Sequence, residues 1–312
     1  MIGWAGGPQQ DDYAKARSLY AEGKNKEVID LCNQILKKDP KHSGVFNTRG
    51  CARHNLGDYK GALDDFHASI ALSDSDPIVF ANVGRSLREL KQFQEALDFF
   101  TDAIKRQPSQ PSHLVERGYT WHKMGDSAKA IQDIEAALAI DPKLARGQGV
   151  YSEVLYDLGR FDESLKAADQ AIALSPKTAE YHQRRASALR RLSRFDDALT
   201  SLDSCIKLGR DSGTIRNERG LILMGAKRYQ EALKDLETAL KLLPGNGVIL
   251  GNRGRCHALS GSDEAALKDY DASLAANPKD GLILRYRAEL REKKGDTGGA
   301  KTDLEASLAV RP

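Results

Sequence analysis

The chain has 312 residues, which is long enough for two globular domains or for one long array of repeats. Its 29% charged and 6% aromatic residues suit a soluble helical protein, and 40% hydrophobic residues are few for one large globular core. With 47 basic and 44 acidic side chains the net charge is +3, so overall charge gives no drive toward nucleic acid or an anionic membrane.

The four cysteines, Cys32, Cys51, Cys205 and Cys256, are scattered without a CxxC spacing. This spacing disfavours a secreted disulfide framework and a zinc site, and favours a reducing compartment. No apolar run approaches the roughly 18 residues that a membrane span needs. The N-terminal residues MIGWAGGPQQ also lack the charged region and apolar core of a signal peptide. The sequence therefore predicts a cytoplasmic protein that is not inserted in a membrane and holds no cofactor or metal.

Residues 1–8 are expected to form a flexible N-terminal extension. Residues 9–312 follow a 34-residue frame, whose positions we call places 1 to 34. Repeats 1 to 9 of this frame start at residues 9, 43, 77, 111, 145, 179, 213, 247 and 281. In repeat 4 we predict two amphipathic helices, 116–124 and 127–140, which are separated at Gly125 and followed by Asp141-Pro142. The whole array is expected to repeat this helical hairpin.

Small residues recur at places 8, 20 and 27, for example Gly118, Ala130 and Ala137 in repeat 4. Bulky residues recur beside them at places 17 and 24, so the two helices of a repeat are expected to approach closely. Place 15, between the helices, is glycine in six repeats, as expected where a helix end needs a positive φ. These glycines are Gly23, Gly57, Gly125, Gly159, Gly261 and Gly295.

Proline gives an independent check on the frame. Seven of the ten prolines fall on place 32: Pro40, Pro108, Pro142, Pro176, Pro244, Pro278 and Pro312. Proline is thus kept out of the predicted helix interiors, where it would remove a hydrogen bond and clash with the preceding turn.

This pattern resembles the tetratricopeptide repeat, in which 34 residues form two antiparallel helices with a small–aromatic–small signature and a closing proline. The resemblance covers residues 9–312. It implies an all-α solenoid, a right-handed superhelix of nine helix-turn-helix repeats whose first helices line a concave groove. The chain stops at Pro312 without a solvating helix, which predicts that a partner covers this end or that the natural chain continues.

Charged residues at places 7 and 23 vary together. Place 7 is arginine in six repeats, and five of these six have aspartate at place 23; repeat 6, with Arg185 and Ser201, is the exception. We predict hydrogen-bonded pairs between the two helices of a repeat. The alternative is an arginine ladder that binds phosphate or carboxylate. The predicted pairs are Arg49–Asp65, Arg117–Asp133, Arg219–Asp235, Arg253–Asp269 and Arg287–Asp303.

In tetratricopeptide arrays places 2, 5, 6, 9, 12 and 13 line the groove. Carried over to this chain, the resemblance implies a peptide-binding groove with the following polar and aromatic residues. They are Arg17, Asn47, His54, Asn82, Arg85, Arg88, Tyr119, His122, Lys123, Arg146, Arg184, Arg190, Arg191, Asn217, Asn252, Arg255 and Arg285.

Two specific groove chemistries of the family are disfavoured. No three consecutive repeats carry the lysine and asparagine pattern of the chaperone-tail clamp. A continuous asparagine ladder would need asparagine at place 6 throughout, but only Asn82 and Asn252 provide it. The basic cluster from Arg184 to Arg194 in repeat 6 is either a solvated face or a dock for an acidic or phosphorylated segment.

No glycine-rich phosphate loop, HExxH motif, paired catalytic carboxylates or Ser–His–Asp order is present, so enzyme activity is not expected. The leading hypothesis is a scaffold or adaptor that holds a protein or peptide segment in the groove. One alternative is a structural subunit of a large assembly, such as ciliary, transport or chaperone machinery, including self-association through the uncapped C-terminal end. Another is the regulatory array of an enzyme whose catalytic domain lies outside this chain.

Overall fold

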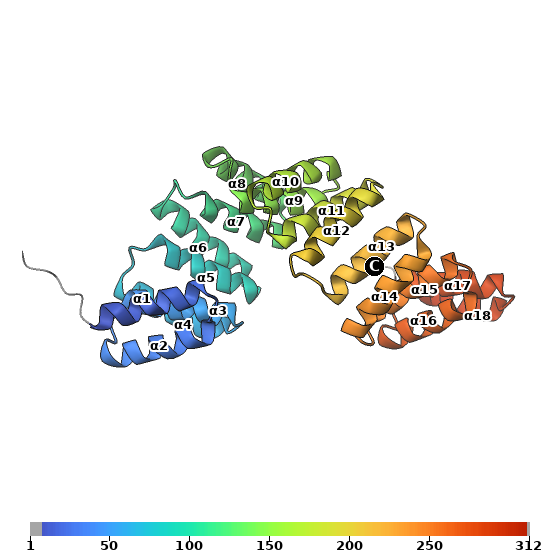
Figure 1. Ribbon diagram of the computed structural model, residues 1–312, viewed down its shortest axis with the longest axis horizontal. Coiled ribbons are helices and arrows are strands. Elements are labelled where there is room, and N and C mark those ends of the chain that lie inside the picture. The colour runs from blue at the N-terminus through green and yellow to red at the C-terminus, as the bar shows by residue number, and fades with distance from the viewer. Residues whose placement is uncertain (1–7, 311–312) are drawn as a thin grey trace, which may run out of the picture. The chain divides into compact units, whose positions relative to one another are not determined.

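The computed structural model describes residues 8–310, and every regular element in this range is an α-helix. Eighteen helices follow one another as nine antiparallel hairpins (Figure 1). The predicted all-α class of nine helix-turn-helix repeats is therefore confirmed. Of the expected N-terminal extension, only Pro8 is described, as the first residue of α1; residues 1–7 and Pro312 lie outside the described residues. No helix between residues 8 and 310 is long and apolar enough to cross a membrane.

The first helices of the hairpins begin 34 residues apart from α3 onward. They are α1 (Pro8–Ala21), α3 (Ser43–Asn55), α5 (Pro77–Glu89), α7 (Pro111–Lys123), α9 (Ala145–Asp157), α11 (Ala179–Arg191), α13 (Gly213–Gly225), α15 (Gly247–Leu259) and α17 (Gly281–Lys293). The second helices are α2 (Asn25–Lys38), α4 (Tyr59–Leu72), α6 (Phe93–Arg106), α8 (Ser127–Ile140), α10 (Phe161–Leu174), α12 (Phe195–Lys207), α14 (Tyr229–Leu242), α16 (Asp263–Ala276) and α18 (Thr297–Ala309).

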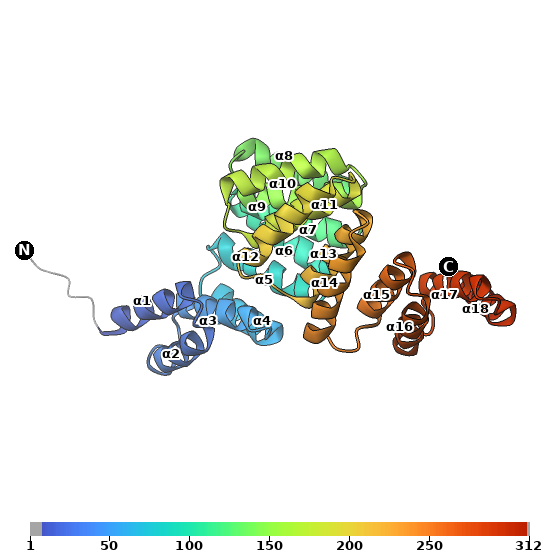
Figure 2. The same cartoon turned by 45° about the vertical axis from the view of Figure 1, so that its right-hand side comes forward.

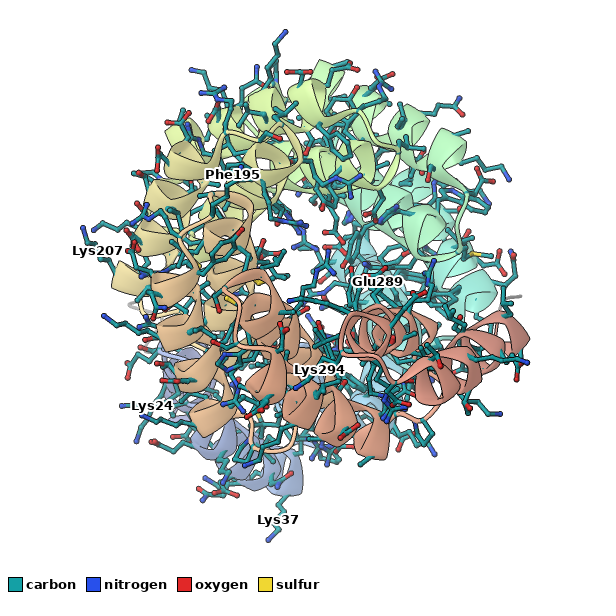
Figure 3. All side chains as sticks on the ribbon, turned by 90° about the vertical axis from the view of Figure 1, so that its right-hand side faces the viewer. Lys24, Lys37, Phe195, Lys207, Glu289 and Lys294 are labelled. Carbon is teal, nitrogen blue, oxygen red and sulfur yellow. The ribbon has the colours of Figure 1, made fainter. Side chains whose placement is uncertain are left out.

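The chain divides into two compact units, which we call the N-terminal unit (to Val154) and the C-terminal unit (from Leu155). Within each unit a hairpin packs on its neighbours in the chain, as α1–α2 beside α3–α4 shows (Figure 2). The second helices keep one face in solvent. Lys37 on α2 and Lys207 on α12 are exposed and point away from the helices (Figure 3).

The first helix of repeat 4 is longer than predicted. Helix α7 begins at Pro111 rather than at residue 116, and it ends at Lys123 rather than at 124. Proline is tolerated in the first helical turn, because the N–H that it lacks has no partner there. Pro111 is thus a helix start as well as the mark of a repeat boundary. The second helix, α8, has the predicted limits 127–140.

Glycine at place 8 lets the two helices of a repeat approach each other. A Cβ atom built on Gly84 would lie 2.9 Å from the ring of Phe100, and one on Gly254 would lie 2.8 Å from the ring of Tyr270. Phe100 and Tyr270, both at place 24, are fully buried. The small residue at place 8 therefore makes room for the bulky side chain at place 24 of the same hairpin, as the sequence predicts.

All nine residues at place 15 have a positive φ. Six are the glycines predicted for this turn, and Gly125 has φ +86°. The other three repeats place a side chain there: Lys91 has φ 62°, Ser193 φ 59° and Lys227 φ 60°. The turn geometry is therefore kept even where the residue type opposes it.

The five predicted Arg–Asp pairs are all present. Arg117 donates from Nε and Nη2 to Asp133 at 2.8 and 2.7 Å, and Arg253 binds Asp269 in the same two-pronged way at 2.7 Å. The aspartates are buried, so each carboxylate needs a cationic partner, and Asp65, Asp235 and Asp303 bond a second arginine as well. The remaining pairs have shortest distances of 2.6 Å (Arg49–Asp65), 2.7 Å (Arg219–Asp235) and 2.6 Å (Arg287–Asp303). The structural interpretation is thus confirmed over a free arginine ladder.

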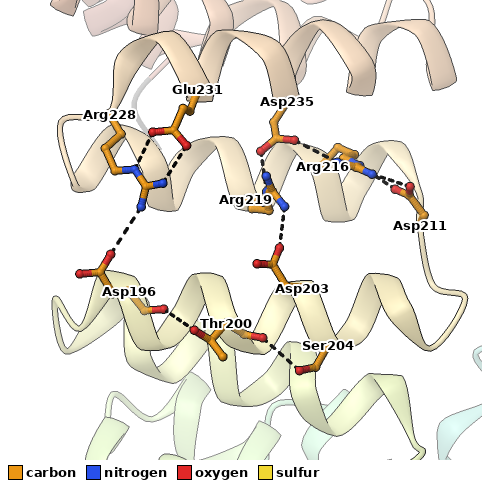
Figure 4. Close-up of polar contacts among 10 residues, drawn as sticks. All are labelled: Asp196, Thr200, Asp203, Ser204, Asp211, Arg216, Arg219, Arg228, Glu231 and Asp235. Carbon is orange, nitrogen blue, oxygen red and sulfur yellow. Dashed lines mark hydrogen bonds and ion pairs between the residues drawn. The ribbon is translucent and has the colours of Figure 1, made fainter.

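Most of these arginines also reach the preceding hairpin. Arg219 on α13 lies between Asp235 on α14 and Asp203 on α12, to which it donates from Nη1 at 2.6 Å (Figure 4). Arg185, which has no aspartate at place 23, bonds Ser201 Oγ and Asp169. The second partner lies at place 25 of the preceding repeat, and the sequence pattern did not predict it. Such contacts are Arg49–Asn33, Arg117–Thr101, Arg185–Asp169, Arg219–Asp203 and Arg287–Asp271.

Candidate functional site

A cavity of about 550 Å³ lies on the first-helix surface of the N-terminal unit. It contains five of the residues predicted for the groove, and the first helices α3, α5, α7 and α9 supply them and most of their neighbours. The predicted residues are His54, Asn82, Arg85, Arg88 and Arg146. The others in its lining are Ile78, Ala81, Gln110, Ser112, His113 and Glu116.

One buried carboxylate joins three of the helices around this cavity. Glu116 on α7 accepts from Arg88 Nη1 on α5 at 2.7 Å and pairs with Arg146 Nη2 on α9 at 2.7 Å. The side chains of Arg88 and Glu116 are only 7% and 11% exposed. Burial alone would raise the pKa of Glu116, but the two arginines outweigh it and hold the pKa below its usual value. The carboxylate is thus ionised and fixes both guanidinium groups.

Aromatic rings hold Arg88 from its other side. Its guanidinium carbon lies 5.0 Å from the ring centre of Tyr119 and 5.8 Å from that of Phe100. Cation–π contacts of this kind strengthen when the charge is removed from water. Arg88 is therefore a rigid part of the cavity wall.

The two histidines of the cavity are uncharged at neutral pH. Burial, followed by the charges of Arg85 and Arg88, lowers the pKa of His54 to about 4, and its Nδ1 lies 2.8 Å from Ser86 Oγ. Burial also lowers the pKa of His113. Among the described residues, the buried Nε2 of His113 has no hydrogen-bond partner. The histidines therefore offer hydrogen bonds but no positive charge.

Arg85 differs from the other two arginines of the cavity. Its Nη1 donates to Asn82 Oδ1 at 3.4 Å, and within residues 8–310 no carboxylate forms an ion pair with it. Asn82 in turn donates to Asn47 Oδ1 at 3.0 Å. The charged lining consists of three arginines and one glutamate. A guanidinium group can pair with a carboxylate or a phosphate, and Arg85 is the arginine of this lining that has no such partner among the described residues.

Five other predicted residues of this unit lie outside the cavity lining, and one of them, Asn47, accepts from Asn82 at 3.0 Å. Lys123 Nζ pairs with Glu153 at 2.9 Å and lies 4.7 Å from the ring centre of Tyr119, and His122 Nε2 lies 3.9 Å from Glu153. Arg17 is exposed on α1. Tyr119, His122 and Lys123 on α7 form a separate cluster with Glu153 on α9, and Tyr119 also contacts Arg88.

In the C-terminal unit the basic cluster of repeat 6 is largely engaged. Arg184 pairs with Glu180 at 2.6 Å, and Arg194, outside the groove set, pairs with Asp197 at 2.7 Å. Arg191 lies over the ring of Phe161 at 4.5 Å. Arg190 donates from Nη2 to the Tyr156 hydroxyl at 3.4 Å, and among the described residues its buried Nε has no partner.

The last four predicted residues lie on α13, α15 and α17. Asn252 donates to Asn217 Oδ1 at 2.9 Å. Arg255 lies over the ring of Tyr286 at 4.0 Å, with Glu289 at 3.8 Å; Figure 3 labels this glutamate on α17. Arg285 is exposed and donates to the carbonyl of Gly281 at 3.3 Å.

Sequence reasoning missed the buried His113 and the lining residues Gln110 and Ser112. His113 holds place 3, which the family's groove pattern does not include. Ser112 holds place 2, a groove position, and could have been found from the frame. Ile78, also at place 2, is 51% exposed and adds an apolar contact to the rim.

A sequence profile described as the tetratricopeptide repeat matches residues 82–145, 152–212, 184–247 and 217–281. No curated protein matches the sequence. Among solved structures, a chain of the APC/C hetero-tetramer Cut9–Hcn1 is similar, with a TM-score of 0.72 at 14% identity over 88% of this chain and 54% of that one. This chain thus spans about half of its length.

Two bacterial structures are similar along almost their whole lengths. A tetratricopeptide repeat protein from Parabacteroides merdae gives a TM-score of 0.58 at 15% identity, covering 85% of this chain and 98% of that one. PilF of Pseudomonas aeruginosa gives 0.61 at 16% identity, covering 69% and 98%. At these identities the likeness concerns the fold alone.

Proposed function

The chain belongs to the tetratricopeptide repeat family, and we propose that it is a non-enzymatic adaptor that binds an acidic or phosphorylated segment of a partner protein. Proteins of this family bind peptides or protein partners. The segment would lie on the first-helix surface of the N-terminal unit, in the cavity beside Arg85. The four unpaired cysteines of the chain are consistent with a reducing, cytoplasmic setting.

The observation that carries this proposal is the unequal use of the three cavity arginines. Arg88 and Arg146 share Glu116, whereas Arg85 has no carboxylate among the described residues. Guanidinium groups bind carboxylate and phosphate in a two-pronged geometry. Glu116 holds Arg88 and Arg146 in place, so only the side chain of Arg85 would have to be ordered when an anion binds.

The test is selection of peptides from a random phage-displayed library on the full chain. We expect enrichment of aspartate and glutamate, and binding that weakens as salt is added. Affinity would be measured by fluorescence anisotropy with the strongest selected peptide in labelled, synthetic form. Arg85→Glu should weaken binding at the cavity about tenfold or more, because a like charge then faces the ligand.

Lys105→Glu is the matched control, since Lys105 lies on α6 outside the cavity lining and its side chain is 71% exposed. Its affinity should equal that of the unchanged protein. If Arg85→Glu binds as many peptides per chain as the unchanged protein, and with the same affinity, the cavity is not a site. If Lys105→Glu abolishes binding while Arg85→Glu does not, use of the outer surface, as in a structural subunit of an assembly, is favoured instead.

The basic cluster of repeat 6 is a second candidate site for the same function. Arg190 has an unpartnered, buried Nε among the described residues, and only the Tyr156 hydroxyl bonds its Nη2. Charge reversal of Arg190 and Arg191 should lower the affinity for the selected peptide if this cluster contributes to binding. Unchanged affinity would assign the cluster to a solvated face.

A further inference from the structure

Four side chains on the first-helix surface occur twice in the same arrangement. Subsite 1, in the N-terminal unit, consists of Asn47, Ile78, Asn82 and Arg85. Subsite 2, in the C-terminal unit, consists of Asn217, Val248, Asn252 and Arg255. Each member of subsite 2 lies 170 residues after its counterpart, which is five 34-residue periods. In both sets the first asparagine is at place 5 of one repeat. The aliphatic residue, the second asparagine and the arginine are at places 2, 6 and 9 of the next repeat.

The asparagine amides are paired in the same way in both subsites. Asn82 Nδ2 donates to Asn47 Oδ1 at 3.0 Å, and Asn252 Nδ2 donates to Asn217 Oδ1 at 2.9 Å. An amide side chain has two N–H donors and one oxygen acceptor. Each pair thus keeps an N–H on the first asparagine and acceptor capacity on the second. An N–H beside a carbonyl oxygen matches the hydrogen-bonding groups of an extended peptide backbone.

The arginine and the aliphatic residue are also available in both subsites. Arg85 forms no ion pair with any carboxylate of residues 8–310. Arg255 lies against Tyr286, and Glu289, at 3.8 Å, is 68% exposed and can be displaced. Ile78 and Val248, in the first turns of α5 and α15, are 51% and 64% exposed.

The junction between repeats 6 and 7 provides a contrast within the chain. There Gln183 and Ser187 both donate to Glu218, and Leu221 stands where the subsites have arginine. The carboxylate replaces an amide and would repel an acidic ligand. The amide pair with its arginine is therefore not a general property of neighbouring repeats.

We propose that subsites 1 and 2 bind the same kind of ligand, an extended peptide segment with an acidic residue next to an aliphatic one. The amide pair would bond the peptide backbone, the arginine the carboxylate, and Ile78 or Val248 the aliphatic side chain. One chain would then bind two copies of a short acidic motif, or a partner that carries the motif twice. This inference rests on the proposed function, and it adds the number of sites and the composition of the motif.

The test is isothermal titration of the full chain with the synthetic peptide selected from the phage library. We expect two peptides per chain. The double variant Asn82→Ala and Arg85→Ala should leave one site, and so should Asn252→Ala and Arg255→Ala. The affinity of each altered subsite for the peptide should fall about tenfold or more, which corresponds to the loss of one charge-assisted hydrogen bond. All four substitutions together should remove binding.

The control is Asn277→Ala, at an exposed asparagine that follows α16 and belongs to neither subsite. It should bind two peptides with unchanged affinity. Far-UV circular dichroism of every variant separates loss of binding from loss of fold, and alanine favours the helices concerned.

Three results would contradict the proposal. Binding of a single peptide, lost on changing subsite 1 and unaffected by changing subsite 2, would overturn the duplication and leave the proposed function standing. Binding that survives all four substitutions would overturn both. Binding of a single peptide to the unchanged protein, unaffected by changing subsite 1 and lost on changing subsite 2, would overturn the duplication and move the function to the C-terminal unit alone.

Discussion

Place 15 ends the turn between the helices of each repeat, and its backbone is left-handed in all nine repeats. A side chain in this conformation costs about 1–2 kcal/mol, because Cβ approaches the carbonyl oxygen too closely. Lys91, Ser193 and Lys227 bear this cost, whereas six glycines do not. The sequence predicted the glycines. The conformation of the other three residues could be inferred only from their shared place in the frame.

Replacing Lys91, Ser193 or Lys227 by glycine should therefore stabilise the protein. We expect about 0.5–1 kcal/mol for each substitution in urea unfolding, since the relief of strain exceeds the added entropy of the unfolded chain. Gly125→Ala is the reverse control, because its added Cβ would meet nothing within 4 Å and only the backbone opposes it. It should destabilise by about 1 kcal/mol. Destabilisation by the three glycines would contradict this account.

The helices of each repeat and of neighbouring repeats are held together by hydrogen bonds and ion pairs of the place 7 arginines as well as by packing. The Arg–Asp pairs could be predicted because places 7 and 23 vary together within one chain. The partner in the preceding hairpin could not, because place 25 holds chemically different residues such as Asn33, Thr101 and Asp203. Helix α7 shows the same limit, since the repeat fixed its existence and only the structure fixed its start at Pro111.

A double-mutant cycle on Arg117 and Asp133 tests the tie at this scale. Each alanine substitution should destabilise by on the order of 3 kcal/mol, because it leaves the other charge half-buried or buried without its partner. The double variant should lose much less than the sum, with a coupling of at least about 1 kcal/mol in urea unfolding.

The exposed pair Lys105–Asp102, at 3.2 Å, is the matched control for that cycle. Its coupling should be at most about 0.5 kcal/mol, since both side chains stay in water. Additive losses at Arg117 and Asp133 would show that the tie contributes nothing beyond its separate residues.

Over the whole molecule, stability is expected to be local. Among the described residues of each compact unit, helices pack against helices one or two apart in the chain and no others. The fold was therefore predictable from one period, since each repeat meets only its neighbours. The cavity was not, because Arg88, Glu116 and Arg146 hold places 12, 6 and 2 of three successive repeats. The trio occurs only here in the frame, so periodicity gives no signal of it.

Hydrogen exchange measured by mass spectrometry tests this locality. Asp65→Ala should speed exchange in α3, α4 and the adjoining helices, and leave α15 and α16 unchanged. Asp269→Ala should have the opposite pattern. Each variant serves as the control for the other, because both remove an aspartate from place 23. Exchange that rises along the entire chain in either variant would show one cooperative unit instead.

Most arginines at place 7 bond both the second helix of their own repeat and the second helix of the preceding repeat. These contacts also determine where whole repeats could be lost or gained by recombination. Removal of residues 213–246 would bring Arg253 opposite Asp203, and its own Asp269 would remain. The new junction would join a guanidinium to a carboxylate. Removal of residues 77–110 would instead bring Arg117 opposite His67, with no carboxylate at that position. The array can thus be shortened at some junctions with an ionic contact between the new neighbours, and at others, such as that of Arg117, which now bonds only the hydroxyl of Thr101 there, without one.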